Sequence, residues 1–218
     1  MPHRPNFYSC RDPYYKDFTP RPSPTILRAM AILKIARMGH PVLRQVAEPV
    51  QDPTAAQVHG LIRNMIDTMR DADGAGLAAP QVHVPLRLVI FHVPAERAGE
   101  SEESAPTPLT VLINPEIEPL TEEKKLGWEG CLSVPGLMGA VPRFTKIRYS
   151  GFAPDGSRIE RVAEDFHARV VQHECDHLDG ILYPQRMTDL SLLIFQEEMR
   201  HGTPDAMREP TEDESEPV

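Results

Sequence analysis

Long apolar runs are absent from this chain of 218 residues. A membrane-spanning helix needs about 20 consecutive apolar residues, and no segment approaches that length. The chain also lacks the succession of basic, apolar and small residues that marks a secretory signal. Cysteine is scarce, because the chain contains only Cys10, Cys131 and Cys175. Their odd number and wide spacing argue against a disulfide framework. We therefore expect a single-domain cytoplasmic protein with no membrane partner.

Basic charge is also in short supply. The 23 Lys and Arg residues stand against 32 Asp and Glu, which leaves a net charge of −9. Residues 202–218 carry −5 of this charge, with six acidic side chains and one basic side chain, and they show no hydrophobic period. Because an acidic chain repels phosphate groups, no direct nucleic-acid partner is expected. Residues 202–218 are predicted to form a disordered acidic tail.

Residues 1–29 likewise lack a hydrophobic period and contain six prolines. They are predicted to be a disordered N-terminal extension upstream of a catalytic domain that spans residues 30–201. Their arginines allow the alternative of an organellar transit peptide, which Asp12, Asp17 and the prolines disfavour.

Hydrophobic spacing predicts both helices and strands within residues 30–201. Asp52-Pro53 signals the start of a helix over about 53–71, and a second helix is expected over 164–178, ended by Asp179-Gly180. A short helical segment is expected over 189–200. The expected strands cover 86–93, 109–114, 117–126, 144–152 and 157–162, the last two as a hairpin around Asp155-Gly156.

The second predicted helix contains the pattern His-Glu-x-x-His. Four residues advance a helix by about 400°, so His173 and His177 lie one turn apart on the same face and can reach one metal ion. Glu174 lies about 100° further round, where it can act as a base on water without being a ligand. The alternative is a solvated helix face, because two ligands alone do not make a tight site.

Two further motifs accompany this helix. Glu-Gly-Cys-Leu-Ser at 129–133 places a thiol in a bend, and Gly-x-Gly-Leu-Ala-Ala-x-Gln at 74–81 places a glutamine after small residues. The three motifs, in this order and spacing, resemble those of the peptide deformylases over residues 30–187. The resemblance implies an α+β fold with mixed or antiparallel sheets packed around a central metal-binding helix. It also implies a metallohydrolase that removes the N-formyl group from the N-terminal formylmethionine of newly made polypeptides, releasing formate.

The resemblance assigns Cys131, His173 and His177 as metal ligands and Glu174 as the catalytic acid and base. Three protein ligands leave a fourth tetrahedral position for water, as in catalytic sites. The alternative for Cys131 is an ordinary buried thiol. Cys175 lies about 200° round the helix from His173 and is expected in the core.

The resemblance also names groups that contact the substrate. Gln81 and the backbone N–H of Leu132 would hold the oxygen that gains negative charge, which makes them catalytic. Gly76 lies in the loop that would receive the substrate backbone. Val170 and Phe166 share the metal-facing side of the helix and either line a pocket for the methionine side chain or pack in the core.

The residues alone do not identify the metal or the binding partners. Imidazole and thiolate ligands suit iron, zinc, nickel and cobalt alike, and the resemblance implies iron(II), Fe2+, in the cell. N-formylmethionyl nascent peptides are the implied substrates. A deformylase can dock on the ribosome through a basic C-terminal helix, whereas this chain is acidic beyond Gly202. A transient ribosome contact by some other route is left open.

Two other functions are weighed against this one. A metallopeptidase would need a third ligand downstream of the two histidines, whereas Cys131 lies upstream. A non-catalytic, metal-stabilised interaction protein would have no use for Glu174 and Gln81, because structural metal binding needs neither.

Overall fold

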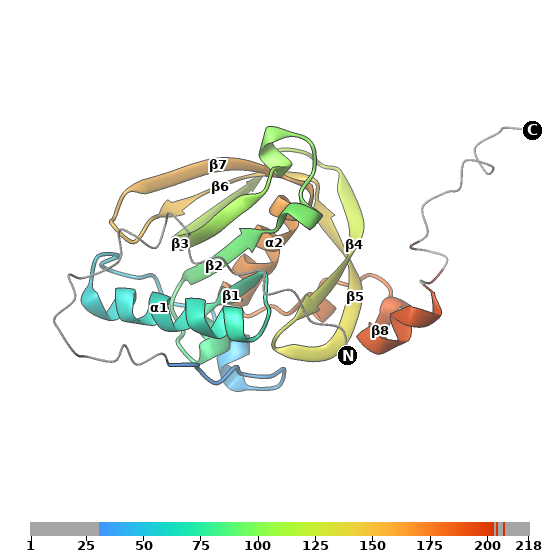
Figure 1. The fold of residues 1–218 in the computed structure, drawn as a ribbon, viewed down its shortest axis with the longest axis horizontal. Coiled ribbons are helices and arrows are strands. Elements are labelled where there is room, and N and C mark those ends of the chain that lie inside the picture. Colours follow the sequence, from blue (N-terminus) through green and yellow to red (C-terminus); the bar gives the residue numbers. More distant parts are fainter. Residues whose placement is uncertain (1–30, 203, 205–206, 208–218) are drawn as a thin grey trace, which may run out of the picture. The chain divides into compact units, whose positions relative to one another are not determined.

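The computed structural model describes residues 31–202, 204 and 207. All of them belong to the compact unit that begins at Ala31. The extension predicted for 1–29 and most of the tail predicted for 202–218 lie outside the described residues. The described part contains two α-helices and eight strands, which form two antiparallel sheets (Figure 1). The α+β class predicted from the sequence is confirmed.

The two sheets enclose the second helix. The larger sheet, in the order β1-β2-β3-β6-β7, consists of β1 (Gly76–Ala78), β2 (Leu88–Val93), β3 (Thr107–Pro119), β6 (Lys146–Phe152) and β7 (Arg158–Glu164). The smaller sheet consists of β4 (Lys124–Cys131), β5 (Val134–Phe144) and β8 (Leu193–Phe195). The helices are α1 (Ala56–Asp71) and α2 (Asp165–Leu178), and α2 contacts strands of both sheets (Figure 1).

Strand β2 is buried on both of its faces. Side chains alternate along a strand, so Val89 and Phe91 point to one face while Leu88 and Ile90 point to the other. The first pair packs in the core that includes α2, and the second pair packs in the core that includes α1. All four residues are fully buried. An uninterrupted apolar run is what a strand covered on both sides requires.

Helix α1 forms where the apolar spacing predicts it, with Val58 and Met65 on its buried face. Its predicted beginning is wrong, because the residue before the first turn is Ala55. The Asp52 carboxylate instead accepts hydrogen bonds from the Thr54 amide at 2.9 Å and the Thr54 hydroxyl at 2.7 Å. Asp52 therefore closes a separate turn, a local arrangement that competes with helix capping.

The strand predicted over 117–126 is wrong, because this stretch divides between the two sheets. Strand β3 runs past Pro115, which only shifts its register against β6, and ends at Pro119. A new strand, β4, begins at Lys124 and pairs with β5. Proline interrupts a ladder hydrogen bond without having to end a strand, and the true break falls in the turn at 120–123.

The helical segment predicted over 189–200 is also wrong. Two 3-10 turns, Leu190–Leu192 and Gln196–His201, flank the short strand β8. Ile194 of this strand pairs with Met138 of β5. Apolar residues at helical spacing were the only signal, and pairing with a distant strand overrides such a local preference.

The hairpin predicted around Asp155-Gly156 is confirmed, and it leads straight into α2. Strands β6 and β7 stay in register along their whole length, and β7 ends where the helix begins. Helix α2 ends at Leu178, and Gly180 then turns the chain with a φ of 72°. Across the described residues, no helix has the length and apolar character needed to cross a membrane.

Gly180 gives a test of this helix end, with Gly136 as its matched control. Both adopt left-handed φ angles, of 72° and 79°. A Cβ on Gly180 would lie 2.8 Å from the Arg44 carbonyl carbon, whereas one on Gly136 would meet nothing within 4 Å. We expect Gly180→Ala to lower the free energy of unfolding in urea by about 2 to 4 kcal/mol and Gly136→Ala by about 1 kcal/mol. Equal losses would contradict this account of the turn.

Candidate active site

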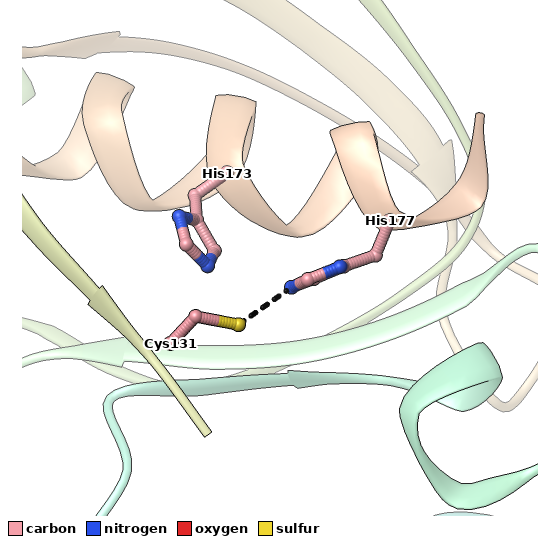
Figure 2. Close-up of side chains that lie close together, drawn as sticks. All are labelled: Cys131, His173 and His177. Carbon is pink, nitrogen blue, oxygen red and sulfur yellow. Dashed lines mark hydrogen bonds between the residues drawn. The ribbon is translucent and has the colours of Figure 1, made fainter. Parts of the chain in front are cut away.

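The imidazoles of His173 and His177 lie next to each other, one helical turn apart on the same face of α2. Their ring centroids are 5.0 Å apart and their planes cross at 82°. Both residues are buried, on the side of the helix that faces the end of β4 (Figure 2). The helical spacing of the two residues is therefore sufficient to bring the rings together, as the sequence predicts.

Cys131, the last residue of β4, completes the group. Its Sγ lies 3.3 Å from Nε2 of His177, and the possible ligand atoms of the three residues all lie within 4.8 Å of one another (Figure 2). The Ser133 amide donates a hydrogen bond to the same sulfur at 3.4 Å. The structure thus brings together the three residues that the motifs single out.

This cluster fits a divalent transition metal. Two imidazoles and a thiolate are ligands of borderline softness, and they leave a tetrahedral position open. One oxygen of the neighbouring Glu174, Oε2, is buried without a hydrogen-bond partner among the described residues. A buried carboxylate oxygen without a partner is unfavourable unless something else approaches it, such as water or substrate.

Glu174 is held beside the cluster in an environment that makes it a proton carrier. Burial raises the pKa of its carboxyl group to about 7, against a weaker opposite effect of His173. Gly76 in β1 leaves the space for this side chain, since a Cβ at Gly76 would overlap the carboxylate. Gly76, predicted to receive the substrate backbone, thus also has a packing reason to be glycine.

Gln81 is buried and its amide has a fixed orientation. Its Oε1 accepts a hydrogen bond from the Ala78 amide at 2.8 Å, so its NH2 group is turned toward Ser133 Oγ, at 3.1 Å, and Cys131 Sγ, at 3.5 Å. Leu132 follows the cysteine directly, and its N–H donates to no described residue. Both predicted oxyanion donors are therefore next to the cluster.

Glu129 is a functional residue that the sequence reasoning did not single out. Its Oε2 accepts a hydrogen bond from Nδ1 of His173 at 2.8 Å, which leaves Nε2 of that ring available to a metal. Arg143 donates to both of its oxygens, at 2.8 and 3.0 Å, and Arg169 adds a contact at 3.0 Å. Burial alone would raise the pKa of Glu129, but His173 and Arg143 lower it well below its usual range.

Arg143 connects this carboxylate to a second one. It donates to Asp176 at 2.6 Å, and Arg186 reaches the other oxygen of Asp176 at 2.7 Å. Glu129 and Asp176 do occur within the motifs, between or beside the proposed ligands. Nothing in the local sequence identifies the arginines, because each comes from a different element.

The cluster lies at the floor of a cleft of about 520 Å³. The chain around β1 forms one side, the β4–β5 hairpin forms the other, and α2 forms the floor. Phe166 and Val170 both line this cleft, so they are placed where a substrate side chain could reach them. Cys175 lies in the core with Leu178, as expected.

Known proteins resemble this chain closely. The sequence pattern of the polypeptide deformylase family matches residues 32–192. Peptide deformylase 1 of Bordetella pertussis is 55% identical over 163 residues, which cover 75% of this chain and 92% of that protein. Peptide deformylase 2 of Ralstonia nicotianae is 53% identical over 166 residues, covering 76% and 93%. The class I type b peptide deformylase from Acinetobacter baumannii, solved with Met-Ala-Ser bound, has a TM-score of 0.64 and 34% identity, covering 73% of this chain and 100% of that one.

The fold and the site together indicate a metal-dependent hydrolase, because two imidazoles and a thiol that could hold a metal ion lie beside a buried carboxylate. More particularly, the chain belongs to the polypeptide deformylase family. It is an enzyme that removes the N-formyl group from the N-terminal formylmethionine of newly made polypeptides and releases formate. The family is metal-dependent. The family assignment made from the three motifs is confirmed.

The contact between Glu129 and His173 predicts an effect on metal affinity. We expect Glu129→Gln to weaken binding of nickel or zinc about 10- to 100-fold, because the imidazole loses the carboxylate that orients it and makes it more basic. Competition with a chromophoric chelator measures this on the folded protein. Glu118→Gln, which removes an exposed partner of Arg148, is the control and should leave the affinity unchanged. A similar affinity in both variants would contradict the role given to Glu129.

Proposed function

We propose that Cys131, His173 and His177 hold the metal of this deformylase and that Glu174 is its acid and base. One observation carries the proposal. One buried oxygen of Glu174, which has no hydrogen-bond partner within the described part of the chain, lies beside the thiol and the imidazoles in the cleft. When bound, the metal would act as a Lewis acid on the formyl group and make water acidic enough to lose a proton near neutral pH.

The proton transfers belong to Glu174. Its carboxylate takes a proton from the attacking water and then delivers that proton to the nitrogen of the leaving amine. A pKa of about 7 suits both steps, because neither form of the group is strongly favoured at neutral pH. The products are formate and a free N-terminal amine.

Gln81 and Leu132 stabilise the charge that develops on the formyl oxygen. The side-chain amide of Gln81 and the main-chain N–H of Leu132 donate hydrogen bonds that strengthen as the oxygen becomes anionic. The hydrogen bond from Ala78 keeps the Gln81 amide from rotating, so this donor is already oriented before the substrate arrives.

The methionine side chain is proposed to enter the cleft along α2, between Phe166 and Val170. The substrate backbone would then run beside the Gly76 region of β1. The Acinetobacter baumannii relative was solved with Met-Ala-Ser, the deformylated form of such a substrate. Its bound peptide supports a peptide site in the corresponding cleft here.

Iron(II), Fe2+, is the metal that we propose for the enzyme in the cell, with zinc, nickel or cobalt as substitutes that the ligands also accept. We place the enzyme in the cytoplasm, where nascent chains begin and thiols stay reduced. Catalysis is assigned to residues 30–201, with 1–29 as an extension and 202–218 as a tail. Any contact with the ribosome would be transient, since 202–218 carries six acidic side chains and one basic side chain.

Formate release from a formyl-Met tripeptide tests the assigned roles. We expect Glu174→Ala to lower kcat by several orders of magnitude, and Gln81→Leu to lower it by about 10²- to 10³-fold because one oxyanion donor is lost. Gln51→Leu is the control. It changes an exposed glutamine that does not line the cleft, and it should leave kcat unchanged. If Gln81→Leu retains the parent rate, the oxyanion role is wrong.

Metal exchange tests the choice of iron. Protein loaded anaerobically with iron(II) should release formate and then lose this activity when exposed to air, because iron(II) and its thiolate ligand oxidise. Nickel-loaded protein should remain active in air. The metal content of freshly purified anaerobic protein, measured by mass spectrometry, gives the direct answer, and a predominance of zinc would contradict the proposal of iron.

A further inference from the structure

Arg97 brings a cation to the cleft. It ends the 3-10 turn Ala95–Arg97, which lies between β2 and β3. Its guanidinium lies over the ring of Phe166, with 3.8 Å between the guanidinium carbon and the ring centroid. Both residues line the cleft, as do two of the proposed metal ligands, Cys131 and His173. Arg97 therefore covers one of the walls assigned above to the methionine pocket.

The N–H groups of Arg97 are available to a ligand. Among the described residues, none accepts a hydrogen bond from this guanidinium and none forms an ion pair with it. The neighbouring Arg169 differs completely, because it donates to three main-chain oxygens at 2.7 to 3.2 Å and to Glu129 at 3.0 Å. Two effects lower the pKa of Arg97. The larger is desolvation of the stacked guanidinium, and the smaller is repulsion from Arg169, as expected for a cation without an anionic partner.

The guanidinium of Arg97 lies in the part of the cleft that the end of the substrate's first side chain would reach. Phe166 precedes His173 by seven residues, which is about 10 Å along a helix. An extended chain from the formyl carbon to the terminal methyl group of methionine contains six bonds and spans about 7 Å. A substrate that has its formyl group at the metal site and its first side chain extended along α2 would bring the end of that side chain to within side-chain reach of Phe166 and Arg97.

We propose that Arg97 determines specificity by binding an acceptor atom at the end of the first side chain, so that the enzyme also deformylates peptides that begin with N-formylmethionine sulfoxide. The inference rests on the proposed pocket of Phe166 and Val170. A sulfoxide oxygen is a strong acceptor for a guanidinium, whereas a thioether sulfur is a weak one. A wholly apolar pocket would disfavour the sulfoxide, because the polar oxygen would lose its water without a replacement.

The chemistry of the reaction stays the same on this substrate. Water adds to the formyl carbon, the bond between that carbon and the nitrogen breaks, and the amine receives the proton. The sulfoxide oxygen is neither added nor removed, so no oxidant or reductant is needed. Arg97 touches only the side chain and takes part in no bond change.

Three formyl tripeptides that differ only in the first residue provide the test. They begin with methionine sulfoxide, with methionine, or with norleucine, which has the shape of methionine without its sulfur. The measured quantity is the ratio of kcat/KM for the sulfoxide peptide to kcat/KM for the norleucine peptide. We expect Arg97→Met to lower this ratio about tenfold or more, because the donor is lost while a flexible apolar side chain still covers Phe166. Arg97→Lys should restore part of the ratio.

Arg158→Met is the matched control. Arg158 is exposed at the start of β7 and does not line the cleft, so this variant should leave the ratio at the parent value. If Arg97→Met lowers kcat/KM equally for the three peptides, or changes none of them, Arg97 is only part of the wall and the inference is overturned. A parent enzyme that fails on the methionine peptide would instead overturn the proposed function, and this inference with it.

Discussion

The buried ion network around Arg143 is the constraint on which the rest of the structure depends. Helix α2 carries two histidines, a glutamate and an aspartate into the interior, where unpaired charge is very unfavourable. Arg143 of β5 satisfies Glu129 of β4 and Asp176 of α2 at the same time, so it fixes the hairpin to the helix. Removing one member of such a buried network strongly destabilises the folded protein, because a charge is left buried without its partner. The spacing between the proposed metal ligands follows from it, because Cys131 comes from the hairpin and both histidines come from the helix.

The sequence allowed the local part of this arrangement to be predicted. Helical periodicity was sufficient to place His173 and His177 on one face, and the Asp155-Gly156 turn was sufficient to place the hairpin. Contacts between residues that are far apart in the sequence could not be predicted in this way. Nothing near Arg143 indicates that its partners lie on β4 and α2, and nothing in 189–200 indicates that three residues add a strand to a distant sheet. These interactions depend on the tertiary fold, which local spacing does not contain.

Each of the three motifs contributes a different kind of group to the site. The helix supplies imidazoles and a buried carboxylate, the end of β4 supplies a thiol and a free N–H, and the turn after β1 supplies an oriented amide. The groups come from rigid elements, so little reorganisation accompanies substrate binding. Arg97 reaches the same cleft from the 3-10 turn Ala95–Arg97, which lies outside these motifs. In the proposed pocket, α2 thus contributes apolar side chains and this loop contributes a cation, and binding groups carried on loops are common in enzymes.

Strand β8 has a consequence for the solution behaviour of the protein. It covers the outer edge of β5 at Leu137, Met138 and Gly139, directly beside the mouth of the cleft. Without it, the hairpin would offer unpaired N–H and C=O groups along an open edge, flanked by apolar side chains. An edge of that kind recruits extended segments of other chains, including unfolded nascent polypeptides. A few residues near the C-terminal end of the described chain thus pair this stretch of β5 within the chain itself, so that β4 and β8 become the outer strands of the described sheet.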